Sequence, residues 1–431
     1  MPKATSTAVK GLRSILASIW SPAAILPWQG TYDFYRDSTR QDGIFASGFL
    51  KRWWARSVLR NQHGNAESPY HDIYTGERTT GAAALAPEQL AQNRADYLAD
   101  VLAHPLNDAF YRERTPDLSK IDVPALVVAN WGGLGLHLRG TIRGWMGLGS
   151  RQKWLKVQSG SYFHTFLQPR NVALQRHFFD RYLKGIDNGW ESEPRVEVEI
   201  RAPGDSVRRV ARSDAWPLPQ TQWTRLYLDA SQKTLAADPP REPASASYAA
   251  LGPGVTFSTS ALPRDLKIVG PVKAKLFLSS STPDMDIFAT VCAFDAAGQE
   301  MTFIAAPEPK APVTQGWLRI SQRKLDPQRS TEYLPFYPHD ERQPLVPGET
   351  YEVDLEIWPM GLWLPQGSRL TLTVQGKDFE RPGATGPLRG VAWFTHDDPV
   401  DRPPELFGGT NTILTGGQRQ SHLLLPILPA R

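Results

Sequence analysis

The amino-acid sequence predicts two parts of different fold class, an α/β part over residues 1–194 and an all-β part over residues 195–431. Two observations support this division. Residues 123–129 form a continuous apolar run between helical segments, which is typical of a parallel strand covered on both faces. Beyond Pro194 the pattern changes to short alternating runs separated by turn signals, without helical segments between them.

The first 115 residues predict mainly helices. Apolar residues recur at helical spacing over residues 4–19, and residues 23–26 predict a short buried strand. Residues 48–54 predict an aromatic helix, residues 61–86 are polar and irregular, and residues 87–104 predict a further helix with Pro87 in its first turn. Helices inserted at about residues 40–115 would form a cap over one edge of the sheet.

Residues 121–190 predict the order strand, crossing, strand, histidine, helix. The strand at 123–129 leads through a glycine-rich stretch into a helix over 136–146, and residues 154–157 predict a second strand. The sequence Gly160-Ser-Tyr-Phe-His164 places a histidine just past that strand, at the edge where α/β sheets collect their chemistry. A helix over 171–183 follows, with Gly185 as its stop. His164 is therefore the strongest candidate site residue.

The all-β part predicts a β-sandwich, in a jelly-roll arrangement, because many strands follow one another without helices. We expect this part to fold on its own, since its strands can complete a closed sandwich. The predicted strands are residues 196–201, 224–228, 272–279, 287–294, 317–322, 350–357, 369–375 and 421–425.

Composition excludes several classes of function. The net charge of +4 is small for 431 residues and the basic residues are scattered, so nucleic acid is not an expected partner. The single cysteine, Cys292, excludes disulfides and multi-thiolate metal sites within the chain. No apolar run is long enough to span a bilayer, and prolines interrupt the weak signal-peptide pattern near the N-terminus. We expect a cytoplasmic protein with no membrane partner, no metal and no cofactor.

Motifs along roughly nine-tenths of the chain resemble the X-prolyl dipeptidyl peptidase and cocaine esterase-type serine hydrolases, a family that includes α-amino-acid ester hydrolases and acylases. The motifs lie at residues 25–37, 121–128, 176–185, 226–228, 284–286, 319–323, 347–348 and 421–426. The resemblance implies an α/β-hydrolase domain with a helical cap, followed by a C-terminal jelly roll. It also implies cleavage of small acyl esters or peptides through an acyl-enzyme, in which a histidine shuttles the proton.

The family's catalytic residues carry over only in part. Gly160-Ser-Tyr-Phe-His164 matches the spacing of the family's Gly-Pro-Trp-x-His pattern, so the resemblance makes His164 the catalytic base. Gly133 stands where the family's Gly-Trp-x-Asp pattern has the acid. The nucleophile motif, Gly-x-Ser-Tyr-x-Gly, is absent together with its oxyanion-hole tyrosine. The α/β-hydrolase domain is thus expected to be incomplete, and the chain to be a truncated serine hydrolase that is inactive on its own.

Two other functions remain open. The chain could be a non-catalytic binding or interaction protein built on the jelly roll and the cap. It could also be an active hydrolase that uses another serine or receives its nucleophile from a partner chain. A parallel sheet that lacks its early strands leaves one edge uncovered, so we also expect aggregation or assembly into a homo-oligomer.

Several residues invite a functional interpretation that we do not favour. His137 is expected to be a helix-start histidine, and Ser161 only superficially echoes the nucleophile motif. Asp284 and Asp286 are too few for a metal site and are expected to belong to the jelly roll. The aromatic residues near the N-terminus have two equally supported roles, the lining of an acyl pocket or the packing of cap against sheet; they are Trp28, Tyr32, Tyr35, Trp53 and Trp54.

Overall fold

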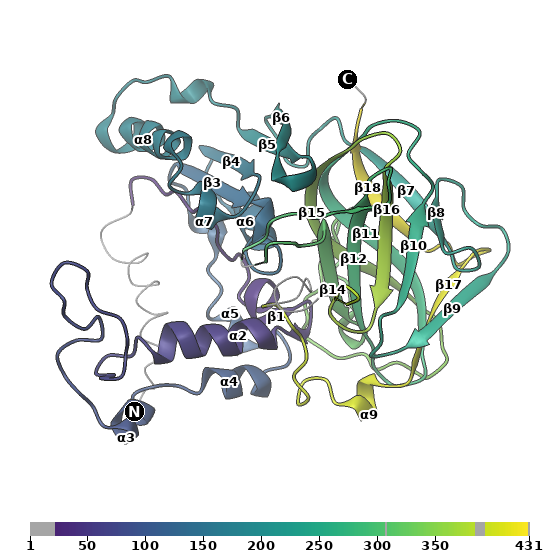
Figure 1. Ribbon diagram of the computed structural model, residues 1–431, viewed down its shortest axis with the longest axis horizontal. Helices are drawn as coiled ribbons and strands as arrows, with labels where there is room; N and C mark the ends of the chain where they lie inside the picture. The colour runs from purple at the N-terminus through teal and green to yellow at the C-terminus, as the bar shows by residue number, and fades with distance from the viewer. Residues whose placement is uncertain (1–21, 307, 384–392, 430–431) are drawn as a thin grey trace.

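The computed structural model describes residues 22–306, 308–383 and 393–429. Figure 1 shows a small lobe that combines helices with a parallel sheet, and a larger lobe that is a sandwich of β-strands. The helix expected at residues 4–19 lies outside the described residues. No helix in the described ranges is both apolar enough and long enough to cross a bilayer.

The parallel sheet contains β3 (Ala125–Asn130), β4 (Lys153–Gln158) and β5 (Val196–Arg201), paired in that order. On the other side of β3 the chain near residues 25–28 runs parallel to it, through bridges from Ile25 to Ala125 and from Trp28 to Val128. The strand expected at residues 23–26 is therefore a short two-bridge segment. β5 follows residue 195 and still pairs with β4, so the parallel sheet includes the first strand of the C-terminal part.

Two helices cover the two faces of this sheet. α6 (Leu138–Gly147) packs on the face that holds Val127 and Ala129, and α8 (Pro169–Lys184) packs on the face that holds Leu126 and Val128. Burial on both faces explains why β3 is a continuous apolar run, as predicted. α8 ends at Gly185, which adopts the left-handed φ of +69° expected of a helix stop.

The cap contains short helices: α2 (Ser47–Trp53), α3 (Pro87–Gln92), α4 (Tyr97–Ala103) and α5 (Ala109–Arg112). The prediction of one helix over residues 87–104 was wrong. The Asp96 side chain accepts a hydrogen bond from the Ala99 backbone N–H at 3.1 Å, and this N-cap starts α4 as a separate helix. The aromatic helix predicted at residues 48–54 is found as α2.

Short elements connect these parts. The remaining elements of the small lobe and the connections are η1 (Tyr35–Thr39), β1 (Arg40–Gln41), β2 (Ile44–Phe45), η2 (Trp54–Leu59), η3 (Leu118–Lys120), η4 (Trp131–Gly133), α7 (Tyr162–Thr165), η5 (Trp190–Ser192), η6 (Pro203–Asp205), η7 (Ile320–Gln322) and α9 (Pro404–Phe407).

The sandwich lobe contains strands from most of the predicted positions. These are β7 (Gln222–Asp229), β11 (Leu266–Ser280), β12 (Asp286–Phe294), β14 (Thr314–Arg319), β15 (Tyr351–Leu364), β16 (Arg369–Gln375) and β18 (His422–Leu428). Six further strands were not predicted: β6 (Val207–Ser213), β8 (Thr234–Ala236), β9 (Ala244–Ala249), β10 (Val255–Thr259), β13 (Glu300–Met301) and β17 (Thr410–Thr415). Pairing connects nine of these strands in the order β13-β12-β16-β10-β8-β7-β18-β11-β15, and β15 then pairs with β5; β14 pairs with β12, β17 with β11 and β9, and β6 with β5.

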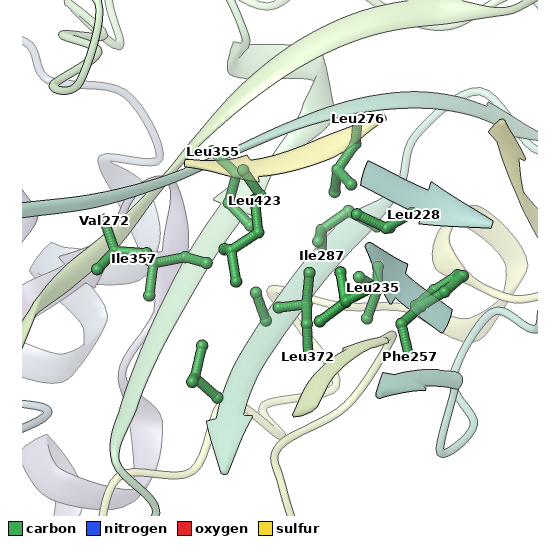
Figure 2. Close-up of a cluster of buried hydrophobic side chains, with 14 of the residues drawn as sticks. Leu228, Leu235, Phe257, Val272, Leu276, Ile287, Leu355, Ile357, Leu372 and Leu423 are labelled. Atoms are coloured by element: carbon green, nitrogen blue, oxygen red, sulfur yellow. The ribbon is translucent and has the colours of Figure 1, made fainter. Parts of the chain in front are cut away.

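The core of the sandwich is formed by branched and aromatic side chains from the facing strands. Figure 2 shows them converging, with Leu228, Leu235 and Phe257 among those drawn. Complete burial of each such side chain stabilises the fold by about 1.5–3 kcal/mol.

A second cluster joins the two lobes. Trp131 and Leu138, at the end of β3 and the start of α6, pack in one cluster with Phe288, Trp317 and Trp358 of the sandwich. Gly361 on β15 makes room for this contact, because a Cβ there would lie 2.3 Å from the Trp131 ring. The two lobes therefore share part of their hydrophobic core.

Buried ion pairs also lie where the two lobes meet. Arg139 on α6 donates to Asp37 Oδ1 at 2.6 Å and to both carboxylate oxygens of Glu356 on β15, at 3.1 and 3.0 Å. Arg143, one turn later, also donates to Glu356 at 3.2 Å. All four side chains are buried or nearly so. Because a broken buried pair leaves an uncompensated charge, this network constrains how the lobes are placed.

Candidate active site

The candidate site lies at the carboxyl ends of β3 and β4, where three loops meet. The loop after β3 contacts the loop after β4, because the Gly132 N–H donates to the Gly160 carbonyl at 3.0 Å. The buried Asn130 side chain connects all three loops. Its Oδ1 accepts from Trp28 Nε1 at 3.2 Å and from Gln29 Nε2 at 3.1 Å, and its Nδ2 donates to Thr165 Oγ1 at 3.0 Å. These bonds fix α7, the element that carries His164.

His164 lies on α7 just past β4, at the sheet edge predicted from the sequence. Ser161 begins this helix, and the His164 N–H donates to the Ser161 carbonyl at 3.0 Å. The imidazole is exposed, and no hydrogen bond or ion pair to it is found within the described ranges. An imidazole in this state has free nitrogens but lacks the third group that orients the base of a catalytic triad.

Gln29 occupies the space next to the position where the family's acid is expected. A Cβ added at Gly133 would lie 2.8 Å from Gln29 Oε1, too close for an unchanged Gln29 side chain. Gln29 itself has a φ of +70°, which is uncommon for a residue with a Cβ, and its Oε1 is buried without a hydrogen bond among the described residues. Gly133 and Gln29 therefore exclude a carboxylate from this place unless the Gln29 side chain moves.

His137 lies at the start of α6, as expected, but its side chain does not cap the helix. The ring meets Tyr162 of α7 edge to face at 5.8 Å between ring centroids. Burial lowers the pKa of His137, and a hydrogen bond with the Gly30 backbone opposes that effect. Its Nδ1 is buried and finds no partner in the part of the chain that the structure describes. His137 thus lies beside the site in surroundings that disfavour its charged form.

The serines nearest to His164 in the sequence have structural roles. Ser161 is buried, and its hydroxyl accepts from the Phe163 N–H at 3.4 Å at the start of α7. Ser159 donates its hydroxyl to the Asp205 carbonyl at 2.7 Å. Neither serine lies in a strand-to-helix elbow that would expose its hydroxyl.

The other residues considered from the sequence are also structural. The Asp286 carboxylate accepts from Arg319 and Arg402, and Asp284 accepts from the Ser321 hydroxyl at 2.6 Å. No cluster of three metal-ligating side chains occurs within the residues described here.

The aromatic residues divide between packing and exposure. The buried Tyr35 hydroxyl donates to the Pro105 carbonyl at 2.8 Å, and Trp54 packs on Tyr97 in the cap. Tyr32 is half-buried, and its hydroxyl accepts from Arg329 at 3.4 Å. Trp28 meets Phe166 edge to face at 5.2 Å, while Trp53 is 39% exposed. Only Trp28 lies among the loops of the candidate site.

The sequence analysis missed several histidine–carboxylate pairs, among them His339 with Asp42 at 3.2 Å and His396 with Asp378. His396 Nδ1 lies 2.8 Å from Asp378 Oδ1, and both residues are buried. Their separation of 18 residues forms no motif, so no sequence signal identified the pair. The His396 ring is enclosed by Phe288 and Trp317, with ring centroids at 5.5 and 5.6 Å. This environment makes the pair part of the core between the lobes.

Family models match most of the chain. Residues 188–424 match the X-Pro dipeptidyl-peptidase C-terminal non-catalytic domain, and residues 15–169 match the X-Pro dipeptidyl-peptidase S15 family. The chain belongs to the X-Pro dipeptidyl-peptidase and cocaine esterase family. The family resemblance found in the sequence is confirmed, and so is the fold class of an α/β-hydrolase domain followed by a C-terminal β-sandwich.

Individual relatives agree with this family. Cocaine esterase of Rhodococcus sp. is 22% identical over 410 residues, which are 81% of this chain and 65% of that protein. Two serine-esterase homologues, from Mycobacterium bovis and Mycobacterium tuberculosis, are 24% identical over 52% of this chain and 40% of their own. The solved structure of a CocE/NonD family hydrolase from Staphylococcus aureus superposes with a TM-score of 0.80 at 29% identity, covering 94% of this chain and 68% of that one.

The family is one of serine hydrolases of the esterase and peptidase type. The chain spans 40–65% of the length of the curated relatives named above. Within this family framework His164 stays the predicted base, since its position after β4 is the one that the family pattern specifies.

Proposed function

We propose that this 431-residue chain forms part of a serine hydrolase for small acyl esters or peptides. It supplies the sheet edge that holds the catalytic base, His164, and the C-terminal sandwich, and it is inactive on its own. The observation that carries this proposal is the exposed imidazole of His164 at the edge of a parallel sheet in which the described residues include no nucleophile elbow. A histidine can act as general base only when a hydroxyl lies within hydrogen-bond reach. Among the residues that the structure describes, no hydroxyl forms a hydrogen bond with the His164 imidazole.

The surface around His164 supports the docking of a nucleophile-bearing segment. Phe163 and Leu167, on either side of His164 in the chain, are 69% and 77% exposed, and Val172 at the start of α8 is 46% exposed. Apolar side chains gathered in this way are typical of a surface that another segment covers. Beside it, the chain at residues 25–28 pairs with β3 on one side, and no described strand pairs with its other side.

The same surface suggests how an acyl group would be bound. Trp28 and Phe166 meet edge to face next to the loops that carry His164, and they offer aromatic area to an apolar acyl chain. Groups that contact the leaving group decide between ester and peptide substrates. The proposal therefore names the substrate class, small acyl esters or peptides, and the acyl-transfer mechanism.

The test is covalent labelling of the 431-residue protein with a fluorophosphonate probe, together with turnover of p-nitrophenyl acetate. We expect no stoichiometric label, and hydrolysis no faster than that of a His164→Ala variant. His71→Ala is the matched control, because His71 is also an exposed histidine but lies in the cap. Stoichiometric labelling that is lost in His164→Ala and kept in His71→Ala would refute the inactivity and would identify an active serine through the labelled peptide.

A further inference from the structure

A separate cleft of about 450 Å³ lies where β6 meets the sandwich strands β11 and β15. Its charged lining is mainly cationic, although the net charge of the chain is only +4. The cleft is lined by Arg208, Arg209, Arg264, Lys267, Asp265 and Trp363, together with an apolar contact from β5.

A β-bulge directs one of these arginines toward the cleft. In the pairing of β5 with β6, Ile200 lies opposite Arg209 and Arg201 lies opposite Val207, so Arg208 is an extra residue without a partner in the ladder. A bulge turns a side chain out of the normal alternation of a strand and is frequent beside functional sites. The guanidinium carbon of Arg208 lies 4.8 Å from the centroid of the Trp363 ring.

Trp363 and Lys267 line the side of the cleft that faces β6. They face each other across the β11–β15 ladder, so the indole and the ammonium group are fixed by two central strands of the sandwich. Burial lowers the pKa of Lys267 and the charge of Arg209 lowers it further, while Asp265 opposes both. The Asp265 carboxylate also accepts from the Gln366 N–H at 2.8 Å, which fixes it at the rim.

We propose that this cleft binds a small ligand that carries a phosphate or diphosphate group. Guanidinium groups present planar pairs of N–H donors that match two oxygens of a phosphate, and several cations around one cleft offset the cost of desolvating a multivalent anion. The cleft volume lies in the range of small-molecule sites. This site belongs to the junction of the lobes and does not depend on the proposed hydrolase activity.

The test is calorimetric titration of the 431-residue protein with inorganic pyrophosphate at constant ionic strength. We expect a dissociation constant below about 1 mM. Arg208→Gln/Arg264→Gln should weaken binding by about ten-fold or more, because the variant loses two guanidinium groups that would donate to the phosphate oxygens. Arg212→Gln is the matched control, because Arg212 lies on the same strand but pairs with Glu197 at 2.9 Å outside the cleft, and it should bind pyrophosphate like the unmodified protein.

Two outcomes would overturn the proposal. One is the absence of saturable binding, and the other is equal affinity in Arg208→Gln/Arg264→Gln and the unmodified protein. The single variant Arg264→Gln, at an exposed loop residue, keeps the test valid if the double variant loses its circular dichroism spectrum. A second arm uses vesicles containing phosphatidic acid, and binding to vesicles without binding to pyrophosphate would overturn the assignment to a small ligand.

Discussion

Replacement of Arg139 by methionine should lower the free energy of unfolding by about 3 kcal/mol, near the lower end of the range for broken buried pairs. Arg139 makes three hydrogen bonds to two buried carboxylates, Asp37 and Glu356. Both carboxylates keep other donors when it is removed. Asp37 still accepts from the backbone N–H groups of Tyr32 and Asp33, at 2.8 and 2.7 Å, and Glu356 still accepts from Arg143. These donors limit the cost but leave the network with an excess of buried negative charge.

Urea denaturation followed by tryptophan fluorescence measures this change. The matched control is Arg212→Met, which removes an arginine that is 67% exposed and donates to Glu197 at 2.9 Å. Exposed pairs contribute less than about 1 kcal/mol, so the control should be nearly neutral. The loss in free energy of unfolding caused by Arg139→Met should also persist at about 0.5 M salt, because buried ion pairs are poorly screened. Equal, small effects of the two substitutions would refute the argument that the buried network holds the lobes together.

Three further predictions follow from the structure. Burial alone would raise the pKa of Asp401, but Arg319 and Arg40 hold it below its ordinary value of 3.8. The ionised carboxylate therefore contributes stability that is fully present above pH 3.8 and is lost as pH falls through the native pKa. Asp401→Asn should destabilise the protein strongly at pH 7 and less at pH 3, and a constant urea-midpoint difference would contradict this. If the sheet edge and the exposed apolar side chains beside His164 drive the homo-oligomer expected from the sequence, Phe163→Ser/Leu167→Ser should reduce self-association in sedimentation velocity, whereas Val400→Ser, at a residue that is 72% exposed elsewhere, should not. Equal effects of the two changes would contradict an association surface beside His164. The sequence alone favours a sandwich that folds on its own, but the shared core leads us to predict the opposite. Residues 195–431 expressed alone should lack a cooperative transition by circular dichroism, because Trp317, Trp358 and Glu356 lose their partners on α6 and β3, and a single sharp transition would show that the sandwich is self-sufficient.

Elements with strong local signals could be predicted from the sequence. β3 is recognisable because it is apolar on both faces, and α8 because its apolar spacing ends at a glycine that adopts a positive φ. The strands that were missed carry weaker signals. β9 consists of small and polar residues, with only Tyr248 fully buried, and β17 gains its place in the sheet from its pairing with β9 and β11. Such strands depend on tertiary pairing more than on their own composition.

Long-range contacts limited the prediction of the site. His164 could be placed from its position after a strand, but the Gln29 side chain reaches Gly133 only because the chain near residue 28 pairs with β3, about a hundred residues later. The same limit applies to the core that joins the lobes. Trp131 and Gly361 are far apart in the sequence, and only the folded chain shows that the glycine makes room for the indole.

The groups that hold the site edge differ from the groups that would perform acyl transfer. Asn130 fixes the three loops through amide hydrogen bonds to Trp28, Gln29 and Thr165, and none of these bonds needs a triad carboxylate. These contacts can therefore hold α7 and His164 in place with a glycine at position 133. A side chain at residue 133 would contact the Gln29 carboxamide, whose oxygen would lie 2.8 Å from the added Cβ. Restoring an aspartate at this position would require a new conformation of Gln29 as well, so the chemistry of this edge depends on both residues together.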